Sequence, residues 1–106
     1  MKTFMFRNET FPEGIECCLE YYRREKLIEI YSITDTGMWE DFLVATTTPE
    51  NIVIPEDCVV VRSYKINGVL DALVALGVIE VLYPVRLNLA QGHMCRVTKR
   101  IYDYVA

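Results

Sequence analysis

Three consecutive runs in the first half of the chain alternate between apolar and polar residues. The runs are residues 15–22 (IECCLEYY), 27–34 (LIEIYSIT) and 38–48 (MWEDFLVATTT). Each is rich in β-branched and aromatic side chains, and short polar turns separate them. A period of two over runs of this length is typical of half-buried strands. The pattern therefore predicts an antiparallel meander, and residues 2–7 (KTFMFR) suit a further strand before it.

Tight turns at both connections fix the expected register. The first hairpin, closed around residues 24–25, pairs Leu19 with Ile30 and, two residues further on, Tyr21 with Ile28. The second hairpin, closed around Thr36, pairs Ile30 with Phe42 and Ile28 with Val44. Both turns place the same apolar side chains on one side of the sheet. The expected core face consists of Leu19, Tyr21, Ile28, Ile30, Phe42 and Val44.

The opposite side of the meander follows from the same register. It carries Glu16, Glu20, Tyr22, Glu29, Tyr31, Ile33, Trp39, Asp41 and Leu43. Glu20 is expected directly opposite Glu29, and facing like charges weaken a sheet. Water would tolerate these carboxylates, whereas a second closed core would not. We therefore expect this side to be exposed, and it combines acids with aromatic rings.

The second half predicts one helix among further strands. Residues 48–57 (TPENIVIPED) are expected to form a loop and residues 58–64 a buried strand. A helix is expected over about residues 67–77, with Asn67 as its N-cap and Gly77 as a left-handed residue at its end. Residues 78–83 and 84–89 are expected to be extended, followed by a turn at 90–92 and a strand over 93–104. In that hairpin, Cys95 and Val97 would pair with Leu87 or Leu89. The prediction is a single α+β domain over residues 1–106, a mainly antiparallel meander packed by one principal helix, with a C-terminal hairpin.

The expected helix has an unusually smooth side. Its core stripe is predicted to consist of Val69, Leu70, Leu73, Val74 and Leu76. Its other side is Gly68, Asp71, Ala72 and Ala75, which bears one charge. Two interpretations stay open: the C-terminal hairpin covers this side, or it forms a self-contact in a homo-oligomer.

Charge is unevenly distributed along the 106 residues. The net charge is −4, with twelve acids and five bases in residues 1–60 but three acids and six bases in residues 61–106. An acidic chain is a poor candidate for direct nucleic-acid binding, because such binding depends on neutralising phosphates. The acidic half favours either a basic protein partner or simply solubility. No apolar run reaches the ~18–20 residues that span a bilayer, and MKTFMFRNET does not resemble a signal peptide. We expect a cytoplasmic protein without membrane partners.

No catalytic or metal-binding pattern stands out. The four cysteines, Cys17, Cys18, Cys58 and Cys95, lack zinc-site spacing and are expected to be buried thiols. His93, the single histidine, follows Gly92 at an expected hairpin tip, a poor position for a general base. The Glu20–Glu29 pair lies on an open face, where water is not excluded. We therefore assign no catalytic residues, metal or other cofactor, and expect a non-enzymatic protein.

The candidate partner-binding residues lie on the acidic and aromatic side of the meander. They are Glu16, Glu20, Tyr22, Glu29, Tyr31, Trp39 and Asp41. Aromatic side chains are enriched at the centres of protein interfaces, and charges around them steer the partner and fix its orientation. The alternative function is a homo-oligomeric structural or accessory protein, with the smooth side of the helix at its self-contact.

Several core and capping positions resemble a family of short uncharacterised proteins encoded by phages and conjugative elements of gut bacteria. The residues that carry the resemblance are Pro55, Glu56, Cys58, Val61, Asn67, Leu73, Gly77, Ile79, Gly92 and Cys95. The resemblance implies an accessory protein of a mobile genetic element. Small acidic proteins of that setting, such as anti-CRISPR proteins, inhibit host defence nucleases by occupying nucleic-acid-binding surfaces. Carboxylates would then replace phosphates in a basic channel, and aromatic rings would replace stacked bases.

Overall fold

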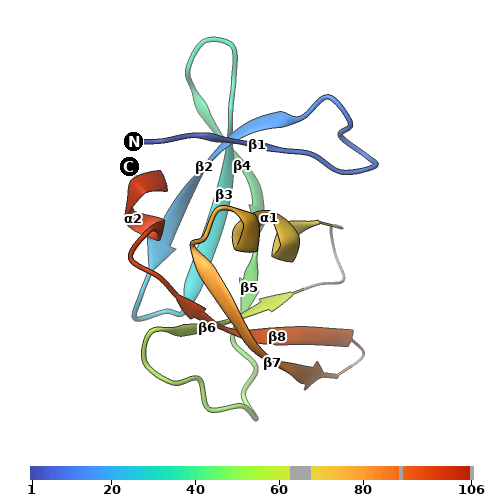
Figure 1. Ribbon diagram of the computed structural model, residues 1–106, viewed down its shortest axis with the longest axis vertical. Coiled ribbons are helices and arrows are strands. Elements are labelled where there is room, and N and C mark those ends of the chain that lie inside the picture. The colour runs from blue at the N-terminus through green and yellow to red at the C-terminus, as the bar shows by residue number, and fades with distance from the viewer. Residues whose placement is uncertain (63–67, 89, 106) are drawn as a thin grey trace.

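The chain forms two four-stranded antiparallel sheets and two short helices (Figure 1). The computed structural model describes residues 1–62, 68–88 and 90–105. The first sheet has the order β1-β2-β3-β4 and the second β5-β6-β8-β7. The strands are β1 (Phe4–Phe6), β2 (Ile15–Tyr22), β3 (Leu27–Ile33), β4 (Trp39–Val44), β5 (Thr46–Thr47), β6 (Cys58–Arg62), β7 (Ile79–Leu87) and β8 (Ala90–Val97). The helices are α1 (Val69–Ala75) and α2 (Ile101–Tyr104). The domain is thus rich in sheet, and its helices are minor elements.

The first sheet is the expected meander, with one shift of register. Leu19 pairs with Ile30 and Tyr21 with Ile28, which confirms the first hairpin. The second hairpin keeps the predicted register next to its turn, where Tyr31 pairs with Asp41. Beyond that point the prediction was wrong: Ile30 pairs with Leu43 instead of Phe42, and Val44 pairs with Glu29 instead of Ile28. The register shifts between Ile30 and Tyr31, where β4 has a bulge. A bulge puts one extra residue into a strand and so exchanges the faces of the residues beyond it.

The bulge lets two successive apolar residues pack towards the core. Phe42 and Leu43 both contact the main hydrophobic cluster, whereas Val44 is 39% exposed. The ring of Phe42 packs edge-on against Phe6 and Phe11, with ring centroids 5.7 and 5.5 Å apart. Strict alternation would have turned Leu43 out to water, so the two core contacts together favour the irregular register.

The chain leaves the first sheet and enters the second at Ala45. The Ala45 amide donates to the Ile28 carbonyl of β3 at 2.9 Å, and the Ala45 carbonyl accepts from the Arg62 amide of β6 at 3.0 Å. The next residue, Thr46, is buried, and its hydroxyl oxygen accepts from the Ile28 amide at 3.0 Å. The expected single strand over 38–48 is therefore divided between two sheets. Its backbone remains fully paired through the change of direction, as buried polar groups require.

The second sheet corrects the expected C-terminal hairpin. Strand β7 runs continuously through Pro84, and β8 already begins at Ala90, so residues 90–92 are strand and not a turn. Gly92 lies within β8, where an added Cβ would come within 3.0 Å of the Val61 carbonyl oxygen. This glycine therefore serves close packing between strands, not chain reversal.

The pairing and the end of β8 also differ from expectation. Cys95 pairs with Val81 and Val97 with Ile79, not with Leu87; the alternative partner Leu89 lies outside the described residues. The strand ends at Val97, and α2 occupies the last part of the segment expected to be strand. The second helix packs against β2, with Ile101 fully buried.

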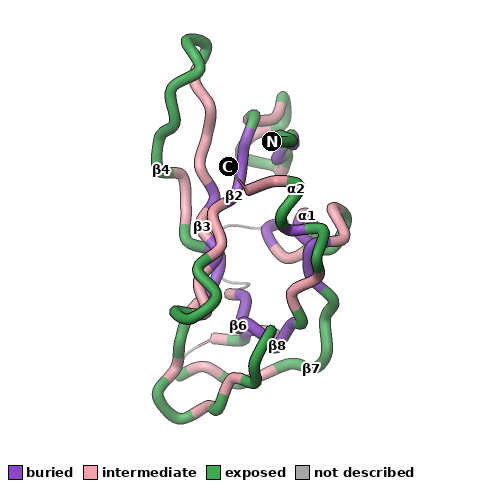
Figure 2. The backbone as a smooth tube through the Cα atoms, turned by 90° about the vertical axis from the view of Figure 1, so that its left-hand side faces the viewer, coloured by how far each residue is buried: buried purple, intermediate pink, exposed green. Residues whose placement is uncertain are grey.

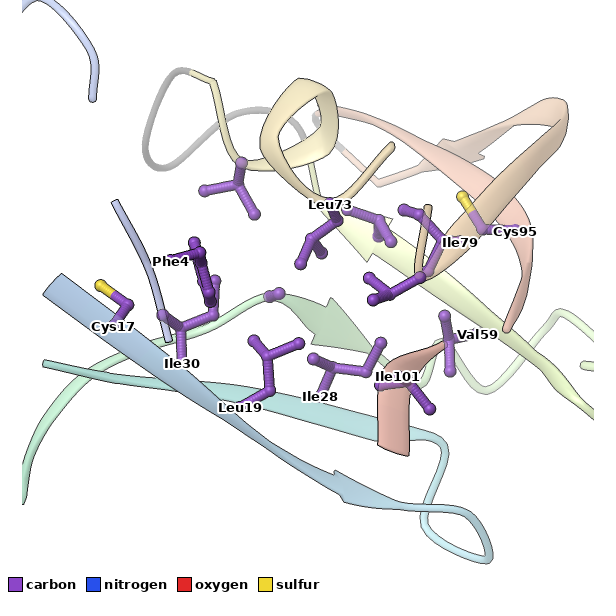
Figure 3. Close-up of a cluster of buried hydrophobic side chains, with 14 of the residues drawn as sticks. Phe4, Cys17, Leu19, Ile28, Ile30, Val59, Leu73, Ile79, Cys95 and Ile101 are labelled. Atoms are coloured by element: carbon purple, nitrogen blue, oxygen red, sulfur yellow. The ribbon is translucent and has the colours of Figure 1, made fainter. Parts of the chain in front are cut away.

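The main core lies between the sheets and is closed by the two helices. Figure 3 shows Leu19, Ile28 and Ile30 of the first sheet facing Val59, Ile79 and Cys95 of the second, with Leu73 of α1 and Ile101 of α2 beside them. A smaller cluster covers the other side of the second sheet, where Ile52 and Ile54 of the 48–57 loop pack on Cys58, Val60 and Met94. That loop carries no strand, as expected.

Helix α1 is shorter than the predicted 67–77. It begins at Val69 and ends at Ala75, and the expected cap Asn67 lies outside the described residues. Gly77 adopts the predicted left-handed conformation, with φ 75°. In the core stripe, Val69 and Leu73 are buried and Leu70 and Leu76 are partly buried. Val74 is 42% exposed and was assigned wrongly; Ala72 contacts the core in its place.

Candidate functional site

The acidic and aromatic side of the first sheet faces solvent, and its acidic and aromatic residues are exposed or half-buried. Figure 2 shows both helices on one side of β2, β3 and β4, and no described element lies against the other side of β3 and β4. We call this other side the outer face; around the buried Cys18 of β2 it carries Glu16, Glu20, Tyr22, Glu29, Tyr31, Ile33, Trp39, Asp41 and Val44. The seven predicted partner-binding residues therefore share one surface. Leu43 was placed there wrongly, because the bulge exchanges it with Val44.

The register explains how the face is assembled. Glu20 pairs with Glu29 across β2 and β3, as predicted, and Tyr31 pairs with Asp41 across β3 and β4. Ile33 pairs with Trp39 towards the far end of the hairpin. Side chains that are paired across strands lie about 5 Å apart at their Cβ atoms. Two carboxylates and the Tyr31 ring thus lie side by side near the middle of the face.

The two sheets carry charged side chains of opposite sign. The four strands of the first sheet contain five carboxylates and no lysine, arginine or histidine. The second sheet carries Arg62, Arg86 and Arg96 but only one acid, Glu80. The uneven distribution of charge along the sequence therefore corresponds to an uneven distribution over the folded domain, in which the outer face is negative.

Tyr31 connects an acid to the tryptophan. Its hydroxyl donates a short hydrogen bond to Oε2 of Glu29. This bond to the carboxylate raises the pKa of Tyr31 well above its usual value, so the phenol stays neutral. The Tyr31 and Trp39 ring centroids are 5.7 Å apart with planes tilted by 36°. The rings form a platform next to the carboxylates of Glu29 and Asp41.

The bulge adds a feature that the regular alternation did not predict. A hollow of about 150 Å³ opens between β3 and β4, lined by Glu29, Ile30, Tyr31, Asp41, Phe42, Leu43 and Val44. Four of these residues belong to the outer face, so the hollow opens on that side. The sequence signal for it was the apolar pair Phe42-Leu43, which cannot alternate and still keep both residues in the core.

The predicted self-contact on α1 is only partly free. Asp71 and Ala75 are exposed, but Ala72 contacts the core. Gly68 lies beneath the N-terminal segment: an added Cβ would be 3.6 Å from Asn8 Cβ and 3.7 Å from the Arg7 carbonyl oxygen. An open groove of about 420 Å³ remains between this segment and Gly68, Asp71 and Ala72. The chain's own N-terminal segment, not the C-terminal hairpin, covers part of the smooth side.

His93 does not lie at a hairpin tip, as predicted, but within β8. It pairs with Val61 of β6 and Pro84 of β7, and its Nδ1 is buried without a hydrogen-bond partner in the part of the chain that the structure describes. No acid or nucleophile is paired with it in the described strands. Among the described residues, no hydrogen bond orients its Nδ1.

The four cysteines are buried free thiols. Burial raises the pKa of Cys95 to about 12 and that of Cys17 to about 11, because a thiolate would lose its hydration. Both therefore remain protonated near neutral pH, the opposite of a reactive cysteine. Within the described ranges, no three His, Cys, Asp or Glu side chains lie close enough together to hold a metal ion. Neither described helix has the length and apolar character needed to cross a membrane.

Comparison with protein-family models, curated proteins and solved structures finds no match for this chain. The resemblance to short proteins of phages and conjugative elements therefore stays a prediction.

Proposed function

We propose that this protein is a non-enzymatic interaction module that binds a basic protein through the outer face. The observation that carries the proposal is that Glu20, Glu29, Tyr31, Trp39 and Asp41 share one side of strands without a single basic residue, with Trp39 and Asp41 exposed and the other three half-buried. In the setting implied by the sequence resemblance, the partner is a host defence nuclease. The face would occupy its nucleic-acid-binding channel, in the manner of an anti-CRISPR protein.

The chemistry of the face supports a nucleic-acid-like role. Proteins that bind single strands combine a positively charged groove with aromatic platforms on which bases stack. The outer face offers the complement of both: carboxylates for the groove, and the Tyr31–Trp39 ring pair for the stacking surfaces. Alternate residues of a strand lie roughly 7 Å apart and neighbouring strands about 4.8 Å. The acids are therefore distributed over all three strands of the face, with Glu20 and Glu29 as a close pair.

The arrangement argues for binding rather than chemistry. Glu20 and Glu29 lie on an open sheet surface, where water has free access, and His93 belongs to the other sheet. A paired-carboxylate or histidine mechanism requires positioned groups around an enclosed substrate. The ring pair and carboxylates instead match the composition of interface centres, where aromatic anchors contribute most of the binding energy.

The proposal is tested by removing three charges and the Tyr31 hydroxyl while keeping side-chain shape. A combined variant, E20Q/E29Q/Y31F/D41N, should lose at least about 100-fold in affinity for a basic nuclease, since interface anchors contribute about 2 kcal/mol or more each. Binding is measured by calorimetry at two salt concentrations after pull-down from host lysate. Circular dichroism and thermal unfolding establish that the variant is folded.

A matched control separates the face from total charge. Glu9, Glu13 and Glu50 are exposed acids outside the sheets, and E9Q/E13Q/E50Q also removes three negative charges. This control should bind within a few-fold of the unmodified protein, because only long-range attraction has changed. Undiminished binding by the folded face variant would falsify the surface assignment.

A further inference from the structure

We propose that the hollow at the β4 bulge receives one arginine side chain of the partner, and that this arginine anchors the complex. The inference rests on the proposed function and adds the chemistry of the contact. It is drawn from four features: a hollow, two flanking carboxylates, an oriented tyrosine and an adjacent aromatic pair.

The shape of the hollow limits its occupant. At about 150 Å³, it accommodates one side-chain head group but not an extended ligand. It is lined by Ile30 of β3 and by Phe42 and Leu43 of the bulged segment of β4, together with the outer-face residues Glu29, Tyr31, Asp41 and Val44, which we call its rim. A regular β3–β4 pair would have filled this space with alternating side chains. The bulge is therefore the structural cause of the site.

The charges on the rim select a cation. Glu29 projects from β3, and Asp41 projects from β4 opposite Tyr31, so carboxylates border the hollow on both strands. Tyr31 donates to Oε2 of Glu29 and thereby holds that carboxylate in place. A carboxylate offers about four acceptor positions. The single bond from Tyr31 therefore leaves Glu29 able to accept from a ligand as well.

The geometry favours a guanidinium over an ammonium. A guanidinium presents five donors in a plane and can bond two carboxylates at once, whereas lysine offers a compact point charge. Its plane also stacks on aromatic rings, and the Tyr31–Trp39 pair lies directly beside the acids. Val44, 39% exposed on the rim, would contact the methylene stem. Lysine would satisfy the charge without the stacking or the paired hydrogen bonds.

The test uses two peptides, ten-residue alternating Arg-Gly and alternating Lys-Gly. Trp39 is the only tryptophan of the chain, so its fluorescence reports binding beside the hollow without a label. The arginine peptide should bind about tenfold more tightly than the lysine peptide, because bidentate and stacking contacts are lost in lysine. Val44→Phe fills the hollow without changing charge and should reduce that preference to less than twofold. Met5→Phe adds a ring to β1 at the far edge of the same sheet and should leave the preference intact.

Equal affinity of the two peptides for the unmodified protein would overturn the proposal, and so would a preference that survives in a folded Val44→Phe variant. The absence of binding to either peptide at millimolar concentration would also overturn it. These failures are distinct from failure of the proposed function. If both peptides bind equally and E20Q/E29Q/Y31F/D41N loses both, the outer face is the binding surface and only the arginine anchor is wrong.

Discussion

At the scale of single residues, the Glu20–Glu29 pair opposes stability and serves binding. The two acids face each other across β2 and β3, where like charges destabilise a sheet. Glu20→Gln should therefore raise the free energy of unfolding by about 0.5 kcal/mol, while weakening binding to the basic partner. Urea denaturation and calorimetry measure the two effects on the same sample. A loss of stability in this variant would contradict the view that the pair is kept for recognition.

The first hairpin and the second illustrate what residue patterns can predict. Leu19 and Tyr21 flank Glu20, and Ile28 and Ile30 flank Glu29, so the two acids mark the faces of both strands. One turn position was then enough to place all four apolar side chains. The segment Phe42-Leu43-Val44 has no polar residue to mark its faces. Its register is decided by which side chains fit the core, and that depends on Phe6 and Phe11 from distant parts of the chain. Local alternation cannot supply this information.

At the scale of elements, the 48–57 loop acts as a strap over the second sheet. Ile52 and Ile54 pack on Cys58, while the far end of the strap is tied to the β2–β3 turn. Arg23 Nη2 lies 2.9 Å from a Glu56 oxygen and 2.7 Å from an Asp57 oxygen, and Lys26 Nζ donates to the Pro55 carbonyl at 2.9 Å. The ion pairs are exposed and therefore weak. The strap should open locally, well before the whole domain unfolds.

Thiol labelling tests this opening. Cys58 is buried beneath the strap, so Arg23→Ala should raise its rate of alkylation several-fold, because opening becomes more frequent. Cys17 and Cys95 lie in the main core and should keep their labelling rates. Arg24→Ala removes a neighbouring exposed charge and serves as the control. Mass spectrometry of partly labelled protein gives each rate; equal acceleration at all four cysteines would show global destabilisation instead of strap opening.

The number of sheets could not be predicted from element patterns. Residues 38–48 form one continuous strand-like run, and Ala45 carries no mark of a boundary. The division arises because the Ala45 amide and carbonyl find partners on different strands, Ile28 and Arg62. Similarly, α2 follows a strand that alternates up to Val97, and a four-residue helix is too short to show a helical period. Short elements of this kind are determined by tertiary contacts.

At the scale of the whole molecule, the two sheets carry opposite charge. The negative outer face and the arginines of the second sheet give the domain an electric dipole, although its net charge is only −4. Such a molecule approaches a basic partner with its negative side first, which raises the association rate at low salt. The charge of the outer face therefore orients the protein as it approaches a partner, whereas the net charge sets the overall attraction.

Two single variants distinguish those roles. Arg86→Glu replaces a positive by a negative charge on the exposed edge strand β7 of the second sheet, and Asp41→Asn removes one negative charge from the outer face. If orientation dominates, Asp41→Asn should slow association with the arginine peptide about two- to fivefold at low salt, while Arg86→Glu changes it by less than twofold. Both effects should shrink as ionic strength rises to ~0.15 M, where charges are screened beyond about 8 Å. Stopped-flow fluorescence of Trp39 measures the rates. The contrary result is an association rate of Arg86→Glu that rises by a larger factor than that by which the rate of Asp41→Asn falls. That result would mean that total charge, not the outer face, attracts the partner.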